Sequence, residues 1–379
     1  MFSVLLPTNS LLVAALSLLL TRLSSSSLSV PDIPHIAAYF GTKTRYEEVN
    51  PHLLRDLTSV NTSVLKPPPN ERCSPVHLTA VIRHGSRYPT VKNIRRIQKL
   101  SELVRREASR GSGGPEDWLR EIQSRWDMWY TEDMDGQLVM KGREDLRHLA
   151  RRLAAVFPSL LSEENLKKKV LLPVRASVET SHEISVRERR CRGVAMVSGH
   201  PCVSSLQVLE YKSDLKQYWK RSHGHVISGL SSCPLFHHVF RTLDKAGRPR
   251  RSTEASPEPA SILLGHAETL LPLLSLLGLY KDQTPPTANN YHAQHGRSFR
   301  SGRIVPYAAN LLFVLYDCQR GPRLQLLINE SPVRFPGLEA EDAPLYRDVR
   351  ATYRHLLDGC DFNRECEGRT GGRGPNTEL

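Results

Sequence analysis

Residues 78–89 read Leu-Thr-Ala-Val-Ile-Arg-His-Gly-Ser-Arg-Tyr-Pro, and this stretch decides how the chain folds. Its apolar first half, residues 78–82, has the length and composition of a buried strand. Gly85 then allows a sharp turn and a close approach of the backbone to a ligand. Pro89 fixes the chain just before Thr90, a residue type that favours the start of a helix. The stretch therefore predicts a strand, a tight turn and a helix in succession.

The turn places His84 between Arg83 and Arg87. An imidazole can attack phosphorus, and two guanidinium groups can pair with phosphoryl oxygens and stabilise their charge. A histidine beside arginines is also typical of a solvated surface cluster. The position directly after an apolar strand favours the phosphate-binding interpretation, with His84 as the nucleophile.

A helix is predicted to follow the turn, because apolar residues recur there every three or four positions. Its basic side chains lie mostly away from the apolar stripe, and a solvated helix face is the expected role of Arg96 and Lys99. Lys92 lies in the first turn, where it can reach a further phosphate of a ligand. The apolar positions are Val91, Ile94, Ile97, Leu100 and Val104.

A second polar group, Gly265-His266-Ala267-Glu268, follows another short apolar strand at residues 261–264. In α/β proteins, ligands collect outside the carboxyl ends of strands. His266 can donate a hydrogen bond to a phosphoryl oxygen. Glu268, if held protonated, can protonate a leaving oxygen and later activate water. The alternatives are an ordinary strand-end histidine and a carboxylate favoured at a helix start.

Strands and helices alternate over the rest of the chain, which predicts an α/β fold. An amphipathic helix is expected after Gly142. The segment that leads into it, residues 136–142, is expected to serve packing rather than chemistry. The segment 31–69, which ends in three prolines, is expected to be extended, and residues 244–259 to form a flexible loop. Further strands are predicted at residues 168–172, 309–316 and 323–328, and a buried helix at 270–279.

The 379 residues suffice for one large domain or two modest ones, and a formal net charge of +13 with a pI near 9.5 implies an anionic partner. Composition alone leaves a highly phosphorylated small molecule and a polyanion both open. The sequence contains no aromatic-interleaved basic stripe and no zinc-finger spacing. It therefore favours a small polyphosphorylated substrate over nucleic acid.

Residues 1–29 have the pattern of a signal peptide, with an apolar stretch at residues 11–20 followed by small and polar residues. That stretch is short for a membrane span, so no stable span is expected after cleavage; a retained anchor is the alternative. Two N-x-[ST] triplets, at Asn61 and Asn329, fit a glycoprotein of the secretory route. The last four residues, 376–379, keep only the Glu-Leu of K-D-E-L, which leaves retention in the endoplasmic reticulum and secretion both open.

Seven cysteines are an odd number, so at least one is unpaired. Cys360 and Cys366 flank a short polar loop and can close a small disulfide in an oxidising compartment. The other cysteines lack the C-x-x-C spacing of a metal site, so no zinc site is predicted. These are Cys73, Cys191, Cys202, Cys233 and Cys318.

The full motif R-H-G-x-R-x-P at residues 83–89, paired with H-A-E at 266–268, resembles the histidine acid phosphatase family. Within that family it is similar to the phytase-like multiple inositol polyphosphate phosphatase branch, because most other members have H-D where this chain has H-A-E. Leu209–Arg221 and Phe299–Ala308 resemble further parts of the branch. The resemblance extends over roughly residues 31–172 and 205–366.

The resemblance implies a phosphoglycerate-mutase-like α/β sheet with flanking helices, in one domain over residues 30–379. It implies that His84 attacks phosphorus and becomes a phosphohistidine, while Glu268 donates the proton. Arg83, Arg87 and His266 would hold the phosphate, with no metal and no cofactor. The implied substrates are inositol polyphosphates, including inositol hexakisphosphate, and 2,3-bisphosphoglycerate. The implied compartment is the endoplasmic reticulum lumen or the exterior.

Residues 173–205 depart from the family pattern. A further catalytic arginine and a long helical cap are expected here, but the chain offers only Arg175 and the run Arg187–Arg192. The domain is therefore predicted to be shortened at about 173–205 and to carry a reduced α-helical cap. One alternative is a truncated, catalytically impaired isoform that binds polyanions. A mutase of the same superfamily is another, which the signal peptide and the H-A-E sequence disfavour.

Overall fold

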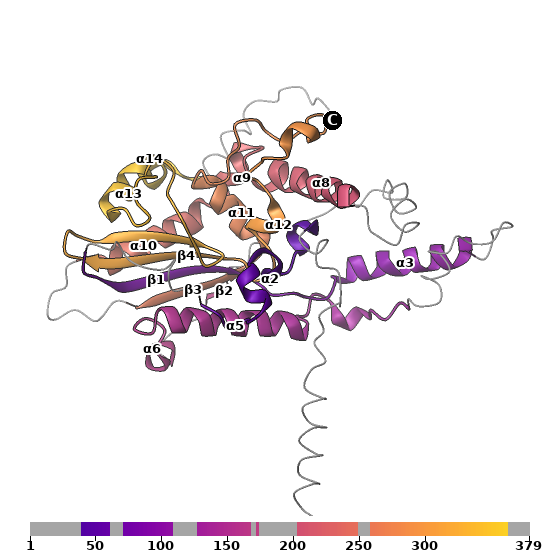
Figure 1. Cartoon of the computed structure of the whole chain (residues 1–379), viewed down its shortest axis with the longest axis horizontal. Helices are drawn as coiled ribbons and strands as arrows, with labels where there is room; N and C mark the ends of the chain where they lie inside the picture. Colours follow the sequence, from indigo (N-terminus) through magenta and orange to yellow (C-terminus); the bar gives the residue numbers. More distant parts are fainter. Residues whose placement is uncertain are drawn as a thin grey trace, which may run out of the picture. The chain divides into compact units, whose positions relative to one another are not determined.

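A computed structural model of the chain describes residues 39–60, 71–108, 127–167, 172–173, 203–248 and 258–362. These residues contain a six-stranded mixed sheet with the strand order β2-β3-β1-β4-β5-β6 (Figure 1). The strands are β1 (Cys73–Arg83), β2 (Leu172–Pro173), β3 (Ala260–Gly265), β4 (Asn310–Cys318), β5 (Arg323–Ile328) and β6 (Ser331–Val333). β1 runs parallel to β3 and antiparallel to β4. The predicted α/β class is confirmed. Of the strand predicted at residues 168–172, only Leu172 lies in the described residues, at the start of β2.

Helices flank the sheet and follow the apolar periodicity of the sequence. The α-helices are α2 (Tyr46–Val49), α3 (Val91–Ala108), α5 (Met140–Val156), α6 (Glu163–Lys167), α8 (Val203–Arg221), α9 (Val226–Leu230), α10 (Cys233–Ala246), α11 (Ala267–Leu276), α12 (Ser301–Ile304), α13 (Tyr346–Thr352) and α14 (Arg354–Gly359). Short 3-10 helices are η2 (Gly41–Lys43), η3 (Pro51–Leu54), η5 (Glu132–Met134) and η7 (Tyr291–Gln294). The predicted helices correspond to α3, α5 and α11. α5 begins before Gly142 rather than after it, and α11 ends before Gly278, whose φ is +78°.

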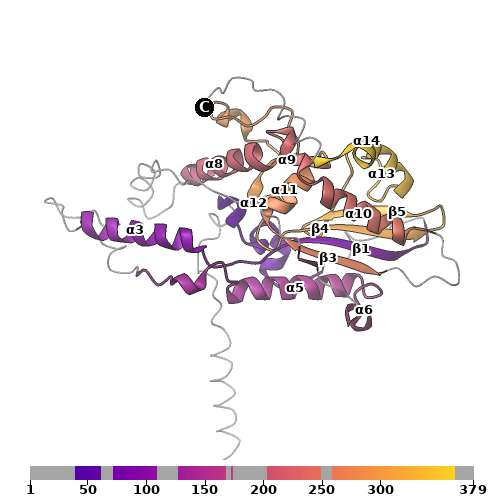
Figure 2. The same ribbon diagram turned by 180° about the vertical axis from the view of Figure 1, so that it is seen from behind.

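The central strand β1 is buried on both faces and divides the core into two parts. Leu78, Ala80 and Ile82 point to one face, where α5 packs through apolar residues such as Leu149. Val81 points to the other face, which α10 and α11 cover. Figures 1 and 2 show α5 along one side of the sheet and α10 with α11 along the other. The continuous apolar run of residues 78–82 is therefore explained by burial on both faces.

The prediction of an extended segment at residues 31–69 is wrong for its described part, residues 39–60. This part forms η2, α2 and η3. Tyr46 and Leu53 are buried and pack with Ala308 in a small core of their own. The Tyr46 hydroxyl also donates to Glu330 (2.7 Å). The burial of these side chains folds the segment, and the three prolines at 67–69 lie outside the described residues.

The loop predicted at residues 244–259 begins later than expected, because α10 continues to Ala246. Leu243 extends the apolar stripe of α10 and is fully buried. Asp244 accepts a hydrogen bond from the Tyr346 hydroxyl (2.7 Å), which holds the last turn of the helix. Residues 249–257 lie outside the described residues.

The predicted disulfide between Cys360 and Cys366 is wrong, because Cys360 pairs with Cys233. This bond joins the start of α10 to the residue after α14. A second disulfide joins Cys73 of β1 to Cys318 of β4, where the two residues are opposite each other in the sheet. Spacing along the sequence missed both bonds because each closes a long loop. Cys366 itself lies outside the described residues, as do Cys191 and Cys202.

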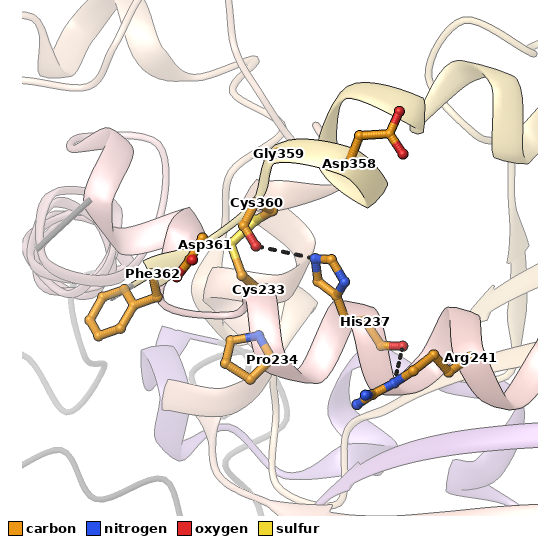
Figure 3. Close-up of a pocket in the computed structure, with 9 residues that line it drawn as sticks. All are labelled: Cys233, Pro234, His237, Arg241, Asp358, Gly359, Cys360, Asp361 and Phe362. Atoms are coloured by element: carbon orange, nitrogen blue, oxygen red, sulfur yellow. Dashed lines mark hydrogen bonds between the residues drawn. A yellow bond between two sulfur atoms is a disulfide. The ribbon is translucent and has the colours of Figure 1, made fainter. Parts of the chain in front are cut away.

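A cavity of about 460 Å³ lies beside the Cys233–Cys360 disulfide (Figure 3). The ring of His237 reaches toward it and its Nε2 lies 3.2 Å from the Cys360 carbonyl oxygen. The lining residues come from the first turns of α10 and from residues 358–362. None of them belongs to the motifs at 83–89 and 265–268, so this cavity is separate from the site that those motifs form.

Asn329, in the second predicted glycosylation triplet, is a buried part of the fold. Asn329 is buried with a φ of +50°, and its side-chain amide donates to the Arg303 and Ile304 carbonyls, both at 3.1 Å. Its Oδ1 accepts from the Asn310 N–H (3.2 Å). Because the amide donates to two backbone carbonyls, we expect it to carry no glycan in the folded protein. The other triplet, at Asn61, lies outside the described residues.

No helix in the described residues is long and apolar enough to cross a membrane. The same residues contain no cluster of three or more His, Cys, Asp or Glu side chains arranged for a metal ion. The predicted signal peptide at 1–29 lies outside the described part of the chain, as does most of the stretch 173–205.

Candidate active site

The carboxyl ends of β1 and β3 bring the two predicted motifs together. The strands are parallel neighbours, with Arg83 opposite Gly265. The His84 N–H donates to the Gly265 carbonyl (3.1 Å), and the ring centres of His84 and His266 are 5.1 Å apart. Because parallel strands end at the same edge of a sheet, motifs that are distant in the sequence meet here.

His84 is a neutral imidazole whose Nε2 carries a lone pair. Its Nδ1 lies 2.7 Å from the Gly85 carbonyl oxygen, which can only accept, so Nδ1 carries the hydrogen. Burial lowers the pKa of the ring to about 3, and the positive charges of Arg83 and Arg87 add to this effect. At neutral pH His84 is therefore in its nucleophilic form.

Arg83 ends β1 with a buried guanidinium. Its Nη1 donates to the carbonyls of Thr42 and Val305, both at 2.6 Å, and its guanidinium carbon lies 4.5 Å from the centre of the Tyr307 ring. Its Nε is buried without a hydrogen-bond partner among the described residues. Burial lowers the pKa of Arg83 to about 10, so the group stays charged at neutral pH. Arg83 thus retains donor capacity for an anion.

Arg87 and Lys92 follow His84 in the sequence and differ in burial, because Arg87 is partly buried and Lys92 is exposed. Arg87 forms an isolated β-bridge with Leu138, which fixes its backbone. Burial lowers the pKa of His266, and the charge of Arg87 contributes next, so Arg87 lies at the same site. Lys92 is exposed in the first turn of α3, and its contact with a substrate phosphate stays a prediction.

Two glycines fix the turn that carries His84. A Cβ on Gly85 would lie 2.0 Å from the Gly142 carbonyl oxygen, and a Cβ on Gly142 would lie 2.0 Å from that of Ser86. The Val139 N–H donates to the Ser86 carbonyl (3.1 Å) just before α5 begins. The start of α5 therefore packs directly on the turn, and the predicted packing role of this segment is confirmed.

Glu268 lies in the first turn of α11, where it pairs with Arg221 at 3.1 Å. Burial alone would raise the pKa of Glu268, but the charge of Arg221, then the hydrogen bond from the Glu268 backbone N–H and then the charge of Arg83 outweigh it, and the pKa falls below its usual value. The sequence leaves open whether the site holds Glu268 protonated, and these contacts favour the ionised form. The protein favours the carboxylate, and the negative charge of a bound phosphate would favour the acid form.

Sequence reasoning missed Arg221, Tyr307 and Lys43 as site residues. Arg221 is the last residue of α8, and the Tyr307 ring lies 5.8 Å from the His84 ring, centre to centre. The Lys43 Nζ lies 5.6 Å from the centre of the Tyr307 ring. Arg221 and Tyr307 do lie in the stretches that resemble the family, but nothing local marks them as site residues. Arg175 and the run Arg187–Arg192, considered for a further arginine, lie outside the described residues.

The site residues of the two motifs, together with Arg221 and Tyr307, fall within a match to a family model. The model of the histidine phosphatase superfamily (branch 2) matches residues 76–180 and 201–330, which include both motifs. The chain therefore belongs to branch 2 of the histidine phosphatase superfamily. The match is interrupted at residues 181–200, inside the stretch that departs from the family pattern.

The chain is also similar to curated multiple inositol polyphosphate phosphatases. It is 34% identical to multiple inositol polyphosphate phosphatase 1 of Homo sapiens over 459 residues, which cover 92% of this chain and 93% of that protein. It is 34% identical to the Gallus gallus protein of the same name over 427 residues, which cover 88% and 93% of the two chains. The human alignment is longer than this 379-residue chain, so at least 80 of its positions lack a counterpart here.

Solved structures share the fold. The phytase from D. castellii has a TM-score of 0.60 at 10% identity, with 91% of this chain and 92% of that chain covered. The Bifidobacterium longum multiple inositol polyphosphate phosphatase, in its complex with inositol hexasulfate, has a TM-score of 0.57 at 11% identity, with 86% and 98% covered. The predicted fold family of a sheet with flanking helices is confirmed.

Proposed function

We propose that this chain is a histidine acid phosphatase that removes phosphates from inositol polyphosphates, including inositol hexakisphosphate, with one catalytic domain over residues 30–379. The observation that carries the proposal is the neutral His84, whose Nε2 is unprotonated beside Arg83 and His266. The names of the similar curated proteins, and the inositol hexasulfate complex of a structural neighbour, support the substrate class.

In the first step His84 Nε2 attacks the phosphorus of the monoester. The P–N bond forms and the bond from phosphorus to the leaving oxygen breaks. Glu268, which takes up a proton from solvent when the phosphate dianion binds, gives this proton to the leaving oxygen, which departs as an alcohol. Arg83, Arg87 and His266 stabilise the phosphoryl oxygens as their charge changes. The two arginines supply the positive charge that the reaction needs, so we propose no metal and no cofactor.

In the second step water attacks the phosphohistidine. The Glu268 carboxylate accepts a proton from this water, a new P–O bond forms and the P–N bond breaks. Inorganic phosphate leaves, and Glu268 releases the proton to solvent, which returns it to the ionised form. The two steps together consume one water and release one alcohol and one phosphate. The depressed pKa of Glu268 suits its second role, because a carboxylate is the base.

The charge of the chain supports a substrate with several phosphates. The net charge is +13, and Lys43 lies 5.6 Å from the ring centre of Tyr307, whose ring in turn lies 5.8 Å from that of His84. We assign Lys92 and Lys43 to phosphates other than the one that His84 attacks. An inositol ring carries neighbouring phosphates in all directions, so cations around the nucleophile can bind several at once.

The test is phosphate release from inositol hexakisphosphate by the purified full chain. We expect release by the wild type, undiminished by a metal chelator, and a loss of roughly 10⁴-fold or more in His84→Ala. His225→Ala is the matched control, because His225 is an exposed histidine at the start of α9. Trapping of a phosphohistidine at residue 84 after rapid quench would identify the intermediate.

The alternative of an impaired, polyanion-binding isoform is favoured by the break in the family match at residues 181–200. Binding of inositol hexakisphosphate by the wild type without any phosphate release would support it and reject the hydrolase. Release that survives in His84→Ala would reject the phosphohistidine mechanism and leave the hydrolase standing.

We further propose that the chain enters the secretory route and functions in the endoplasmic reticulum lumen or outside the cell. The disulfides Cys73–Cys318 and Cys233–Cys360 support an oxidising compartment. Expression of the full chain in a secretory host, with fractionation and N-terminal sequencing, tests this. A cytosolic product that retains residues 1–29 would contradict it.

A further inference from the structure

Arg221 is a buried cation at the site that the two phosphate-binding motifs do not include. It ends α8 and contacts Glu268 through an N–O distance of 3.1 Å. Only 7% of the Arg221 side chain is exposed, against 29% for Glu268. The carboxylate therefore faces the more open side of the pair, and the guanidinium lies behind it.

Among the described residues, the Arg221 side chain has one hydrogen-bond partner besides Glu268. Its Nη1 donates to the Gln217 side chain (3.0 Å), one turn earlier in α8. Its Nε is buried and has no hydrogen-bond partner among the described residues. A buried ion pair of this kind contributes little net stability, because the desolvation of both charges offsets their attraction. Arg221 contacts the proposed proton donor directly, so a role in the reaction explains its position better than a role in stability does.

α8 carries Arg221 on a rigid support. Asp214 is fully buried in the same helix and accepts from the Ser301 N–H and Oγ, both at 2.7 Å. It also pairs with Arg297 at 2.7 Å, and Arg297 in turn contacts Glu210 at 3.2 Å. These bonds tie α8 to α12 and the residues before it. Because α8 is fixed in this way, it holds Arg221 beside Glu268.

Among the described residues, Arg221 is the cation that pairs directly with Glu268. Three other basic side chains lie near that carboxyl. Arg83, from β1, already donates to two backbone carbonyls. His266, at the end of β3, is neutral at neutral pH, because burial lowers its pKa. Lys216, on α8, is exposed, and its charge also acts on Glu268. Arg221 thus dominates the electrostatic environment of Glu268 before substrate binds.

We propose that Arg221 is a positioning residue that holds the Glu268 carboxylate and makes its protonation depend on the arrival of a phosphate dianion. The inference rests on the proposed function and adds a role for a residue outside the motifs. Before binding, the ion pair keeps Glu268 ionised and oriented. A phosphate dianion among Arg83, Arg87 and His266 opposes the field of Arg221, so Glu268 takes up the proton that it later donates.

The same ion pair serves the second step. Once the leaving alcohol has taken the proton, Glu268 is a carboxylate again and regains its contact with Arg221. Arg221 then keeps it in the form that accepts a proton from water. A carboxyl whose pKa were raised by burial alone would be a good proton donor in the first step. It would be a poor base for the attacking water in the second step, because no cation would hold its ionised form in place.

The direct test is the titration of Glu268 by ¹³C NMR in protein labelled at the glutamate carboxyls, with the signal assigned by its loss in Glu268→Gln. In the wild type we expect a pKa below the usual glutamate value and an increase when inorganic phosphate is added. In Arg221→Gln we expect the pKa without phosphate to rise by about 1 unit or more. Arg221→Lys, which keeps the charge, should lie near the wild type.

A kinetic readout follows from the same shift. Glu268 must be protonated to donate, so activity falls as the pH rises through its pKa. A higher pKa in Arg221→Gln therefore moves the alkaline limb of kcat/KM for inositol hexakisphosphate to higher pH, by about 1 pH unit or more. The shift should be smaller with 4-nitrophenyl phosphate, whose leaving group needs little protonation. Ionisation of the substrate is common to both proteins and cancels in the comparison.

Lys212→Met is the matched control, because Lys212 is an exposed cation on the same helix. It should leave both the Glu268 titration and the alkaline limb in place. An unchanged Glu268 pKa in Arg221→Gln, or a pKa that does not respond to phosphate in the wild type, would overturn the inference. These titrations need no turnover, so they separate its failure from a failure of the proposed function, which is absence of phosphate release by the wild type.

Discussion

The contact between α5 and the turn that carries His84 makes Gly142→Ala an informative substitution. A Cβ at this position would lie 2.0 Å from the Ser86 carbonyl oxygen and 2.5 Å from the Ser86 nitrogen. Both are backbone atoms, so no side chain can rotate out of the way. The Val139 N–H also holds the same Ser86 carbonyl at 3.1 Å. The substitution must therefore move the turn or the helix as a unit.

The size of the movement follows from the distances. Ordinary van der Waals contact begins at 3.4 Å, so the Cβ and the Ser86 oxygen must separate by about 1.4 Å from the 2.0 Å they would otherwise have. A misplacement of about 1 Å at a reacting group can cost on the order of 100-fold in rate. Overpacking costs about 1–3 kcal/mol of stability. Replacing a helical glycine by alanine returns about 1 kcal/mol of this.

We therefore expect Gly142→Ala to lose roughly 100-fold in kcat for phosphate release from inositol hexakisphosphate. Its free energy of unfolding, from urea denaturation, should fall by only about 1 kcal/mol. Gly359→Ala is the control, because a Cβ at Gly359, at the end of α14, would meet nothing within 4 Å. Wild-type kcat in Gly142→Ala would refute the argument that this glycine contact sets the position of His84.

Three further predictions concern the scaffold. Asp214→Ala leaves Arg297 without its closest partner in a buried network, so the free energy of unfolding from urea denaturation should fall by about 3–5 kcal/mol. Asp342→Ala, at an exposed ion pair with Arg334, is the control and should change this free energy by less than about 1 kcal/mol. Replacing Cys233 and Cys360 together by serine should cost about 2–4 kcal/mol, and peptide mapping of the wild type should recover the linked pair; a Cys360–Cys366 peptide would contradict the structure. Asn329 should carry no glycan when the chain is made in a secretory host, because its amide donates to two backbone carbonyls. Mass spectrometry after glycosidase treatment measures this, and a glycan at Asn329 would contradict its buried position.

Local sequence pattern predicted the elements well where a single segment carries the signal. The apolar run at residues 78–82 gave β1, and the recurrence of Val91, Ile94 and Ile97 gave α3. It failed where a distant partner decides. The segment 39–60 folds because Tyr46 and Leu53 reach a core near Ala308, which no pattern within the segment indicates. Cys360 pairs with Cys233 rather than with its near neighbour for the same reason.

Some residues of the candidate site could likewise be recognised from the sequence, and others depend on tertiary packing. His84, Arg83 and Arg87 lie within five residues of one another, so their motif could be recognised from the sequence. The sequence leaves open whether Glu268 is an acid or a carboxylate, because it does not show which charged groups face the carboxyl. Arg221 belongs to another helix, and its contact with Glu268 depends on how α8 and α11 pack.

By itself, the stretch Leu78–Pro89 determined a buried strand, a tight turn and a nucleophilic histidine between two arginines, because neighbouring residues along a chain stay neighbours in the fold. Only the tertiary structure decided which groups surround that histidine. Parallel pairing of β1 with β3 brings His266 to His84, and the packing of α8 brings Arg221 to Glu268. The protonation state of a side chain depends on burial and on charges within a few ångströms, and those neighbours come from segments that the sequence holds far apart.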